Sequence, residues 1–305
     1  SSYRVRLVRL QREEDLPLDP EGIITARIAT AAALRKGLGL PTAATNAYRL
    51  VNSEGDYLSG LTVDLFDSTA VVMASALWVE RYRDTVFSAI RSLVGADTQL
   101  VYRVSNAVRR EEAMSAAPEA DPCDPVEILE HDLRFAVDAQ KGQKTGFYLD
   151  QRHNRLRVRH LAKDRSVLDL YCFSGGFGLN AMRGGARRVR CVDSSEPAIR
   201  LARDNATRNK LEGASFEVGD VVDVLSQSER FDMVVCDPPK FAGTRHDLDA
   251  ALTRYARLNH GAMLLLNPGG ILVTCSCSGV VRRDDFIAVV RDAAAQAGRR
   301  VAIIG

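Results

Sequence analysis

The sequence lacks the features of a membrane-spanning, secreted or zinc-binding protein. Its apolar runs stay well short of the roughly 20 residues that a membrane helix needs, and no signal peptide is evident at Ser1. The 6 cysteines include no C-x-x-C pair, which argues against a zinc site or a disulfide framework and favours a reduced, intracellular protein. A net charge of +2 neither requires nor excludes a nucleic-acid partner, so any basic surface must be local.

Two common nucleotide-binding signatures are also absent. The glycine-rich turn at residues 172–178 reads CFSGGFG, not G-x-G-x-x-G, and no phosphate-cradling G-K-[ST] follows it. Glycines in such a turn let a ligand approach the backbone closely. The pattern therefore favours a nucleoside ligand without a pyrophosphate, such as S-adenosylmethionine, over NAD or ATP.

What is present is a strand, a turn, a helix and a second strand that ends on an acid. Residues 167–171 form an apolar run typical of a buried parallel strand, and the turn after it leads into a helix over 179–183. The second strand covers 188–192 and is followed directly by Asp193. A carboxylate at that place accepts hydrogen bonds from ribose hydroxyls. We therefore predict a nucleoside site here in preference to a purely structural turn.

The same alternation continues along the chain. Helices are predicted at 195–209, 221–225, 248–266 and 284–297, and strands at 215–218, 231–236, 271–275 and 301–304. This pattern predicts an α/β fold with a Rossmann-like, doubly wound parallel sheet. Ligands bind such sheets at the carboxyl ends of the strands. We therefore expect Asp193, Asp220, Asp237 and Cys277, which all follow strand ends, to lie on one rim.

The preceding half of the chain predicts a smaller α+β domain. Residues 1–40 read as a strand and a helix left from a preceding domain, and 41–125 as a β-meander, a helix, a strand and a polar linker. Residues 126–305 begin with a hairpin over 126–138 and hold the doubly wound sheet, which we expect to be incomplete at its C-terminal end. The abrupt ends of the sequence indicate a fragment of a longer protein.

The strand-end residues have structural alternatives. Asp220 either accepts from an adenine amino group or caps the helix that follows. The segment Asp237-Pro238-Pro239, which can include a cis bond, forms either a rigid wall for a flat base or a simple strand stop. Cys277 is either a nucleophile beside a carboxylate and a cationic cofactor or an inert cysteine.

Five segments taken together resemble one family. GQKTGFYLDQR, LDLYCFSGGFG, VDSS, CDPPKF and TCSCSG are similar to class I S-adenosylmethionine-dependent methyltransferases that form 5-methylcytosine in bacterial large-subunit ribosomal RNA, the RlmI type. The likeness covers about residues 48–305. It implies S-adenosylmethionine as cofactor, large-subunit rRNA as partner, a cytoplasmic protein (organellar in a eukaryote) and a homodimer as one option. Members of this family carry an N-terminal PUA-type RNA-binding domain, of which we expect only a last strand here.

The resemblance also implies roles for individual residues. Cys277 would add to C6 of cytosine, C5 would then attack the methyl donor, and loss of the C5 proton would expel the thiolate while Asp237 holds the pyrimidine edge. Substrate contacts are implied for Lys144, Pro238, Pro239 and Lys240, and no metal ligand is expected. The implied cofactor-binding residues are Arg152, Asp169, Phe173, Ser174, Gly175, Gly176, Asp193, Ser194, Asp220 and Asp237.

Two other functions stay open at this point. The first is methylation of a base nitrogen, with Cys277 purely structural. Such enzymes often place an aromatic residue directly after the two prolines, whereas Lys240 here precedes Phe241. The second is a non-catalytic module that binds the cofactor or RNA during ribosome assembly.

Overall fold

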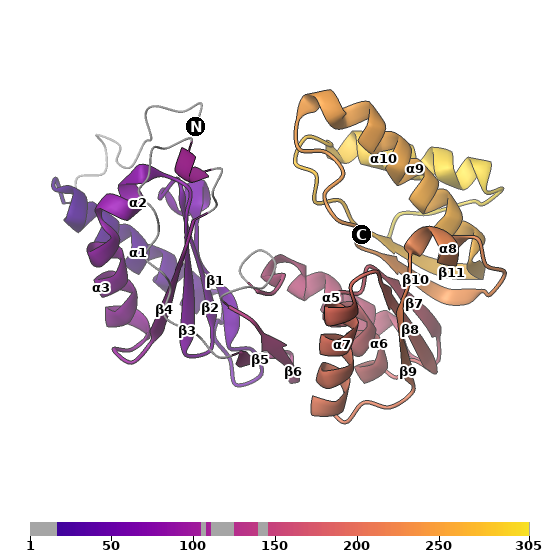
Figure 1. The fold of residues 1–305 in the computed structure, drawn as a ribbon, viewed down its shortest axis with the longest axis horizontal. Coiled ribbons are helices and arrows are strands. Elements are labelled where there is room, and N and C mark those ends of the chain that lie inside the picture. Colours follow the sequence, from indigo (N-terminus) through magenta and orange to yellow (C-terminus); the bar gives the residue numbers. More distant parts are fainter. Residues whose placement is uncertain (1–16, 105–107, 111–124, 140–145, 305) are drawn as a thin grey trace. The chain divides into compact units, whose positions relative to one another are not determined.

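The computed structural model describes residues 17–104, 108–110, 125–139 and 146–304, and the contacts within it divide the chain into two compact units, Ser1–Arg152 and His153–Gly305 (Figure 1). The strand expected at the start of the chain and the proposed substrate residue Lys144 lie outside the described residues.

The N-terminal unit is built on a four-stranded sheet in the order β1-β2-β3-β4. The first three strands form the predicted antiparallel meander, and β4 pairs parallel to β3. The predicted helix over 79–93 is split into two at Tyr82. The elements are α1 (Pro20–Gly37), β1 (Ala47–Asn52), η1 (Ser53–Asp56), β2 (Leu61–Phe66), β3 (Thr69–Ala74), α2 (Leu77–Arg81), α3 (Arg83–Val94) and β4 (Gln99–Arg103).

The hairpin of β5 (Val126–Glu130) and β6 (Leu133–Val137) packs with this N-terminal unit. Leu129 N donates to Asn46 Oδ1 at 2.7 Å, and Asp132 N donates to the Ala44 carbonyl at 3.0 Å. A short helical turn, η2 (Leu149–Gln151), follows. The contacts therefore place the start of the doubly wound unit at His153, later than the position 126 expected from the sequence.

The C-terminal unit contains a five-stranded sheet in the order β11-β10-β7-β8-β9, with every pair parallel. This confirms the Rossmann-like prediction, and the order reverses between β7 and β10, which is where such sheets bind ligands. The elements are α5 (Arg152–Leu161), β7 (Ser166–Leu170), α6 (Gly176–Arg183), β8 (Arg188–Asp193), α7 (Glu196–Arg208), β9 (Ala214–Val218), α8 (Val221–Leu225), β10 (Phe231–Cys236), η3 (Arg245–Asp247), α9 (Leu248–Leu264), β11 (Leu266–Thr274) and α10 (Arg283–Gln296).

The two faces of this sheet bury alternate residues of the strands, as a sheet covered on both sides requires. On one face Val167 and Val189 pack with residues of α5, α6 and α7. On the other, Leu168 and Val192 pack with residues of α8 and α9. The strand predicted at 301–304 is wrong: these residues are exposed and pair with no strand of the described chain.

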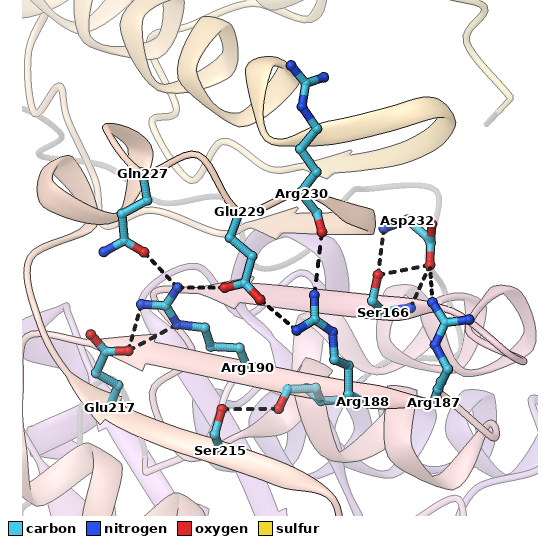
Figure 2. Close-up of polar contacts among 11 residues, drawn as sticks. Ser166, Arg187, Arg188, Arg190, Ser215, Glu217, Gln227, Glu229, Arg230 and Asp232 are labelled. Carbon is cyan, nitrogen blue, oxygen red and sulfur yellow. Dashed lines mark hydrogen bonds and ion pairs between the residues drawn. The ribbon is translucent and has the colours of Figure 1, made fainter.

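Charged side chains tie the starts of the strands together (Figure 2). Asp232 Oδ2 accepts from Ser166 N at 2.9 Å and from Arg187 Nη2 at 3.2 Å, and Asp232 Oδ1 accepts from Asn267 Nδ2 at 2.7 Å. These bonds lower the pKa of Asp232 to about 2. Arg190 bonds Glu217, Gln227 and Glu229 on the neighbouring segments. These bonds hold neighbouring segments of the sheet together.

Candidate active site

The glycine turn coils the chain tightly where β7 ends. Tyr171 and Phe173 have φ of 60° and 47°, and Gly175 has φ of 82°. Positive φ is uncommon for residues other than glycine and persists only where the surroundings impose it. Asp193 Oδ2 accepts from Phe173 N at 2.9 Å, and Asn205 Nδ2 donates to the Ser174 carbonyl at 3.1 Å. The turn is thus held from the end of β8 and from α7.

Packing explains part of the glycine pattern. A Cβ on Gly178 would lie 2.4 Å from Cys191 Sγ, and one on Gly176 would lie 3.0 Å from Arg155 Cδ. Both glycines therefore let α6 approach its neighbours closely. Gly175 instead provides the left-handed backbone that begins α6. Gly175 and Gly176 are both buried.

Asp193 is half-buried at the end of β8 and shapes the turn with both oxygens. Besides the Phe173 bond, its Oδ1 accepts from Ser195 N at 2.9 Å, across the exposed Ser194. A carboxylate oxygen has a second lone pair, so Asp193 keeps the capacity to accept from a ribose hydroxyl. Ser195 caps α7 by accepting from Ala198 N at 3.3 Å.

Asp169 lies inside β7, beneath the turn, and is 0% exposed. Its Oδ2 accepts from Gly178 N at 2.8 Å, whereas its Oδ1 has no hydrogen-bond partner among the described residues. Burial raises the pKa of this carboxyl to about 8, with the charges of Asp237 and Asp193 acting in the same direction. Burial therefore favours the neutral form of this carboxyl, which anchors the start of α6 through Gly178 N.

Asp220 follows β9 and is exposed, and it caps α8 by accepting from Val222 N at 2.8 Å. Asp220 is therefore the N-cap of α8, with its Oδ1 as the acceptor. Gly219 N donates to the Asp193 carbonyl at 3.0 Å, which holds the ends of β8 and β9 side by side. Burial, Cys236 and the charges of Asp220 and Asp193 raise the pKa of Tyr171 to about 12.

These carboxyl groups make the rim rich in acceptors. The charge of Asp193 acts on both Asp169 and Tyr171, Asp220 acts on Tyr171, and Asp237 acts on Asp169. A ligand that brings a sulfonium, an ammonium and ribose hydroxyls complements such a rim, whereas a pyrophosphate would be repelled. The residues present therefore fit S-adenosylmethionine.

The Asp-Pro-Pro loop leaves the end of β10 beside the turn. Asp237 is half-buried, Pro238 is buried, and Pro239 and Lys240 are exposed. The only cis peptide bond in the described part of the chain is Leu40-Pro41, so the peptide bonds of this loop are trans. The cis bond considered from the sequence is not present.

Cys277 lies in the loop after β11 and is exposed, as predicted. Its thiol donates to the Pro238 carbonyl at 3.7 Å, so the candidate nucleophile and the Asp-Pro-Pro loop are neighbours. Cys275 is half-buried and its N–H bonds the Cys236 carbonyl at 2.9 Å. Cys172, Cys191 and Cys236 are buried thiols that form no disulfide bond.

Arg152 is the first residue of α5, at the boundary between the two units.

Three residues that hold the site loops could not be identified from the sequence. Ser278 and Tyr255 bond the loops after β10 and β11, and Asn205 bonds the glycine turn. A serine, tyrosine or asparagine carries no pattern that marks it as a buried partner of a distant loop.

The described residues contain neither a membrane-spanning helix nor a metal-binding cluster. No helix there is long and apolar enough to cross a membrane. No group of three or more histidine, cysteine, aspartate or glutamate side chains there is arranged to hold a metal ion.

Comparisons with known proteins identify the family of this chain. The profile of the S-adenosylmethionine-dependent methyltransferase family matches residues 47–299. A protein of Tolumonas auensis named ribosomal RNA large subunit methyltransferase I is 38% identical over 316 residues, covering 100% of this chain and 78% of that protein. Its namesake in Klebsiella pneumoniae strain 342 is 39% identical over 269 residues, covering 85% of this chain and 67% of that protein.

Solved structures share the fold at lower identity. A protein of Streptococcus mutans described as a SAM-dependent methyltransferase has a TM-score of 0.77 at 22% identity, over 91% of this chain and 73% of that one. A SAM-dependent methyltransferase from Agrobacterium tumefaciens has a TM-score of 0.56 at 16% identity, over 82% and 78%. With the acceptor-rich rim and the parallel sheet in place, the chain belongs to the S-adenosylmethionine-dependent methyltransferase family, together with the proteins named ribosomal RNA large subunit methyltransferase I.

Proposed function

We propose that this methyltransferase forms 5-methylcytosine in large-subunit ribosomal RNA through a covalent adduct with Cys277. The names of its relatives support the class of RNA. The observation that carries the cytosine-C5 chemistry is the exposed Cys277 thiol, 3.7 Å from the Pro238 carbonyl and next to Asp237. C5 of a pyrimidine is a poor nucleophile until a group adds to C6, and a thiolate is suited to that addition.

The reaction begins with addition to the ring. The exposed Cys277 thiol loses its proton to water and its sulfur adds to C6, so the C5=C6 electron pair becomes available at C5. Asp237 contacts the edge formed by N3 and the exocyclic amine, where it stabilises the charge that develops in the ring. C5 would form a bond to the methyl group as the bond from that methyl to the donor sulfonium breaks. Water as the base would then take the C5 proton, the C5=C6 bond would form again, and the C6–S bond would break to release the thiolate.

The cofactor would supply an electrophilic methyl group when bound. Asp193 would hold its ribose and Asp220 its adenine, while the turn over residues 173–176 would lie along the methionine part, with Ser194 beside the ribose acceptor. The buried Asp169 supports this turn through Gly178 N. Arg152 would add a cationic contact for the methionine carboxylate.

Substrate RNA would contact the loop after β10. Pro239 and Lys240 are exposed there, over the buried Pro238. Lys144 completes the proposed substrate set. We also propose that the enzyme acts in the cytoplasm. We propose further that it forms a homodimer, and its molecular mass in sedimentation at micromolar concentration tests this.

Methylation of a base nitrogen is less well supported. In that chemistry an aromatic residue after the two prolines would stack on the base. Phe241 instead packs against Tyr255, with ring centroids 4.8 Å apart, in a small core that also contains Ala242 and Ala251. The half-buried ring is therefore already engaged by Tyr255.

Incubation with cofactor and with RNA that carries 5-fluorocytosine tests the proposal. In 5-fluorocytosine a fluorine replaces the C5 proton, and a base cannot remove it. The covalent adduct therefore persists and shifts the protein on a denaturing gel. We expect an adduct with the native protein and with the matched control Cys275→Ala, and none with Cys277→Ala. Methyl transfer to ordinary RNA without any adduct would favour the base-nitrogen reaction, and cofactor binding without transfer would favour a non-catalytic module.

A further inference from the structure

One buried hydroxyl joins the two loops that carry the proposed nucleophile and acid. Ser278 follows the exposed Cys277 but is itself 3% exposed. Its Oγ accepts from Phe241 N at 3.1 Å and from Ala242 N at 3.2 Å, both in the loop that begins with Asp237. The side chain after the nucleophile thus provides an acceptor for two backbone donors of the opposite loop.

The Ser278 hydroxyl also bonds a tyrosine of α9. Its Oγ and the Tyr255 hydroxyl lie 3.1 Å apart, and either group can be the donor. Ser276 Oγ donates to the Tyr255 hydroxyl, at 3.0 Å. One tyrosine of α9 consequently holds the residues on both sides of Cys277.

The surroundings make these bonds strong. Tyr255 is 0% exposed and packs against Phe241 and Phe286, with ring centroids 4.8 and 5.2 Å away. Hydrogen bonds shielded from water in this way are stronger, and losing one partner is costly, because the other has no water to replace it. The Cys277 thiol also donates to the Pro238 carbonyl, and Cys275 N donates to the Cys236 carbonyl.

We propose that Ser278, oriented by Tyr255, is a positioning residue that fixes the Cys277 sulfur relative to Asp237. This inference rests on the proposed role of Cys277 as nucleophile. A displacement of about 1 Å of a reacting group lowers a rate by about 100-fold. The Ser278 hydroxyl lies on the loop after β11, away from the residues after β8 and β9 that are proposed to bind the cofactor. Its loss should therefore slow the chemical step and leave cofactor binding intact.

The test compares Ser278→Ala, Ser278→Thr and Tyr255→Phe with the exposed control Ser226→Ala. For each, the adduct rate with 5-fluorocytosine RNA, kcat and KM for S-adenosylmethionine are measured well below the melting temperature. We expect Ser278→Ala to lower kcat and the adduct rate by about 100-fold with KM nearly unchanged. Ser278→Thr keeps the hydroxyl and should restore most of the rate. Tyr255→Phe keeps both acceptor bonds of Ser278 and should cost about 10-fold.

Each outcome decides the proposal. A folded Ser278→Ala protein with the native adduct rate, or one in which KM rises as much as kcat falls, overturns it. If Ser278→Ala does not fold, Tyr255→Phe decides: a native adduct rate overturns the proposal and a selective loss of kcat supports it. If the native protein forms no adduct, the proposed function fails and the positioning role falls with it, whereas an adduct in all variants at one rate removes only the positioning role.

Discussion

Replacement of Asp169 by asparagine tests whether a carboxyl beneath the glycine turn is protonated in the folded protein. The side chain is 0% exposed, and burial raises its pKa from the ordinary 3.8 to about 8. Its one bond is accepted from Gly178 N at 2.8 Å. Asparagine has nearly the same shape and can accept the same bond, but it cannot ionise.

The sign of the effect follows from proton binding. Between pH 3.8 and about 8 the folded protein keeps a proton that the unfolded chain has released, so the free energy of unfolding falls as pH rises. The slope for one proton is about 1.4 kcal/mol per pH unit, which gives about 3 kcal/mol from pH 5 to pH 7. The stability that protonated Asp169 contributes is complete below pH 3.8 and is lost as pH rises through about 8. Asp169→Asn lacks this dependence.

The native protein should therefore be more stable than Asp169→Asn at low pH and less stable at high pH. At pH 5 the variant is less stable by about 1–3 kcal/mol, because its amide N–H groups replace the unpartnered Oδ1 in a buried place. By pH 8 the native protein has lost more than that, and the variant becomes the more stable. Urea unfolding at pH 5, 6, 7 and 8, read by hydrogen-exchange protection of β7 amides, measures the C-terminal unit by itself. A difference in unfolding free energy that does not change with pH would mean that Asp169 is ionised in the fold and would refute the reasoning.

Three other predictions concern the same unit. Asp232→Asn should leave the pH dependence of the unfolding free energy between pH 5 and 7 unchanged. The pKa of Asp232 is lowered from 3.8 to about 2, so its ionised form contributes stability above pH 3.8 that is lost as pH falls through about 2, and acid unfolding measures this loss. Gly178→Ala should cost about 1–3 kcal/mol in urea unfolding, because its Cβ would lie 2.4 Å from Cys191 Sγ, and Cys191→Ala in the same chain should recover most of it. Asp193→Ala should weaken S-adenosylmethionine binding at least about tenfold more than Asp220→Ala in calorimetry, since it also frees the turn; equal losses would contradict this.

The order of elements in the C-terminal unit was determined by the sequence alone. Continuous apolar runs separated by helical segments leave a parallel sheet as the arrangement that buries them, and the Ser195 cap and the residues after each strand end follow from local rules. The rim position of Asp193, Asp220, Asp237 and Cys277 follows in turn, because parallel strands end on one side of the sheet.

Only the tertiary structure decided how the site is held. The raised pKa of Asp169 depends on complete burial, and the bond that Phe241 N donates to Ser278 Oγ joins residues 37 positions apart. The packing role of Gly178 exists only because Cys191 of β8 lies against it. No local pattern encodes such contacts, since burial and long-range hydrogen bonding arise only when distant segments meet. For the same reason the run at 301–304, apolar enough to predict a strand, pairs with no strand of the described chain.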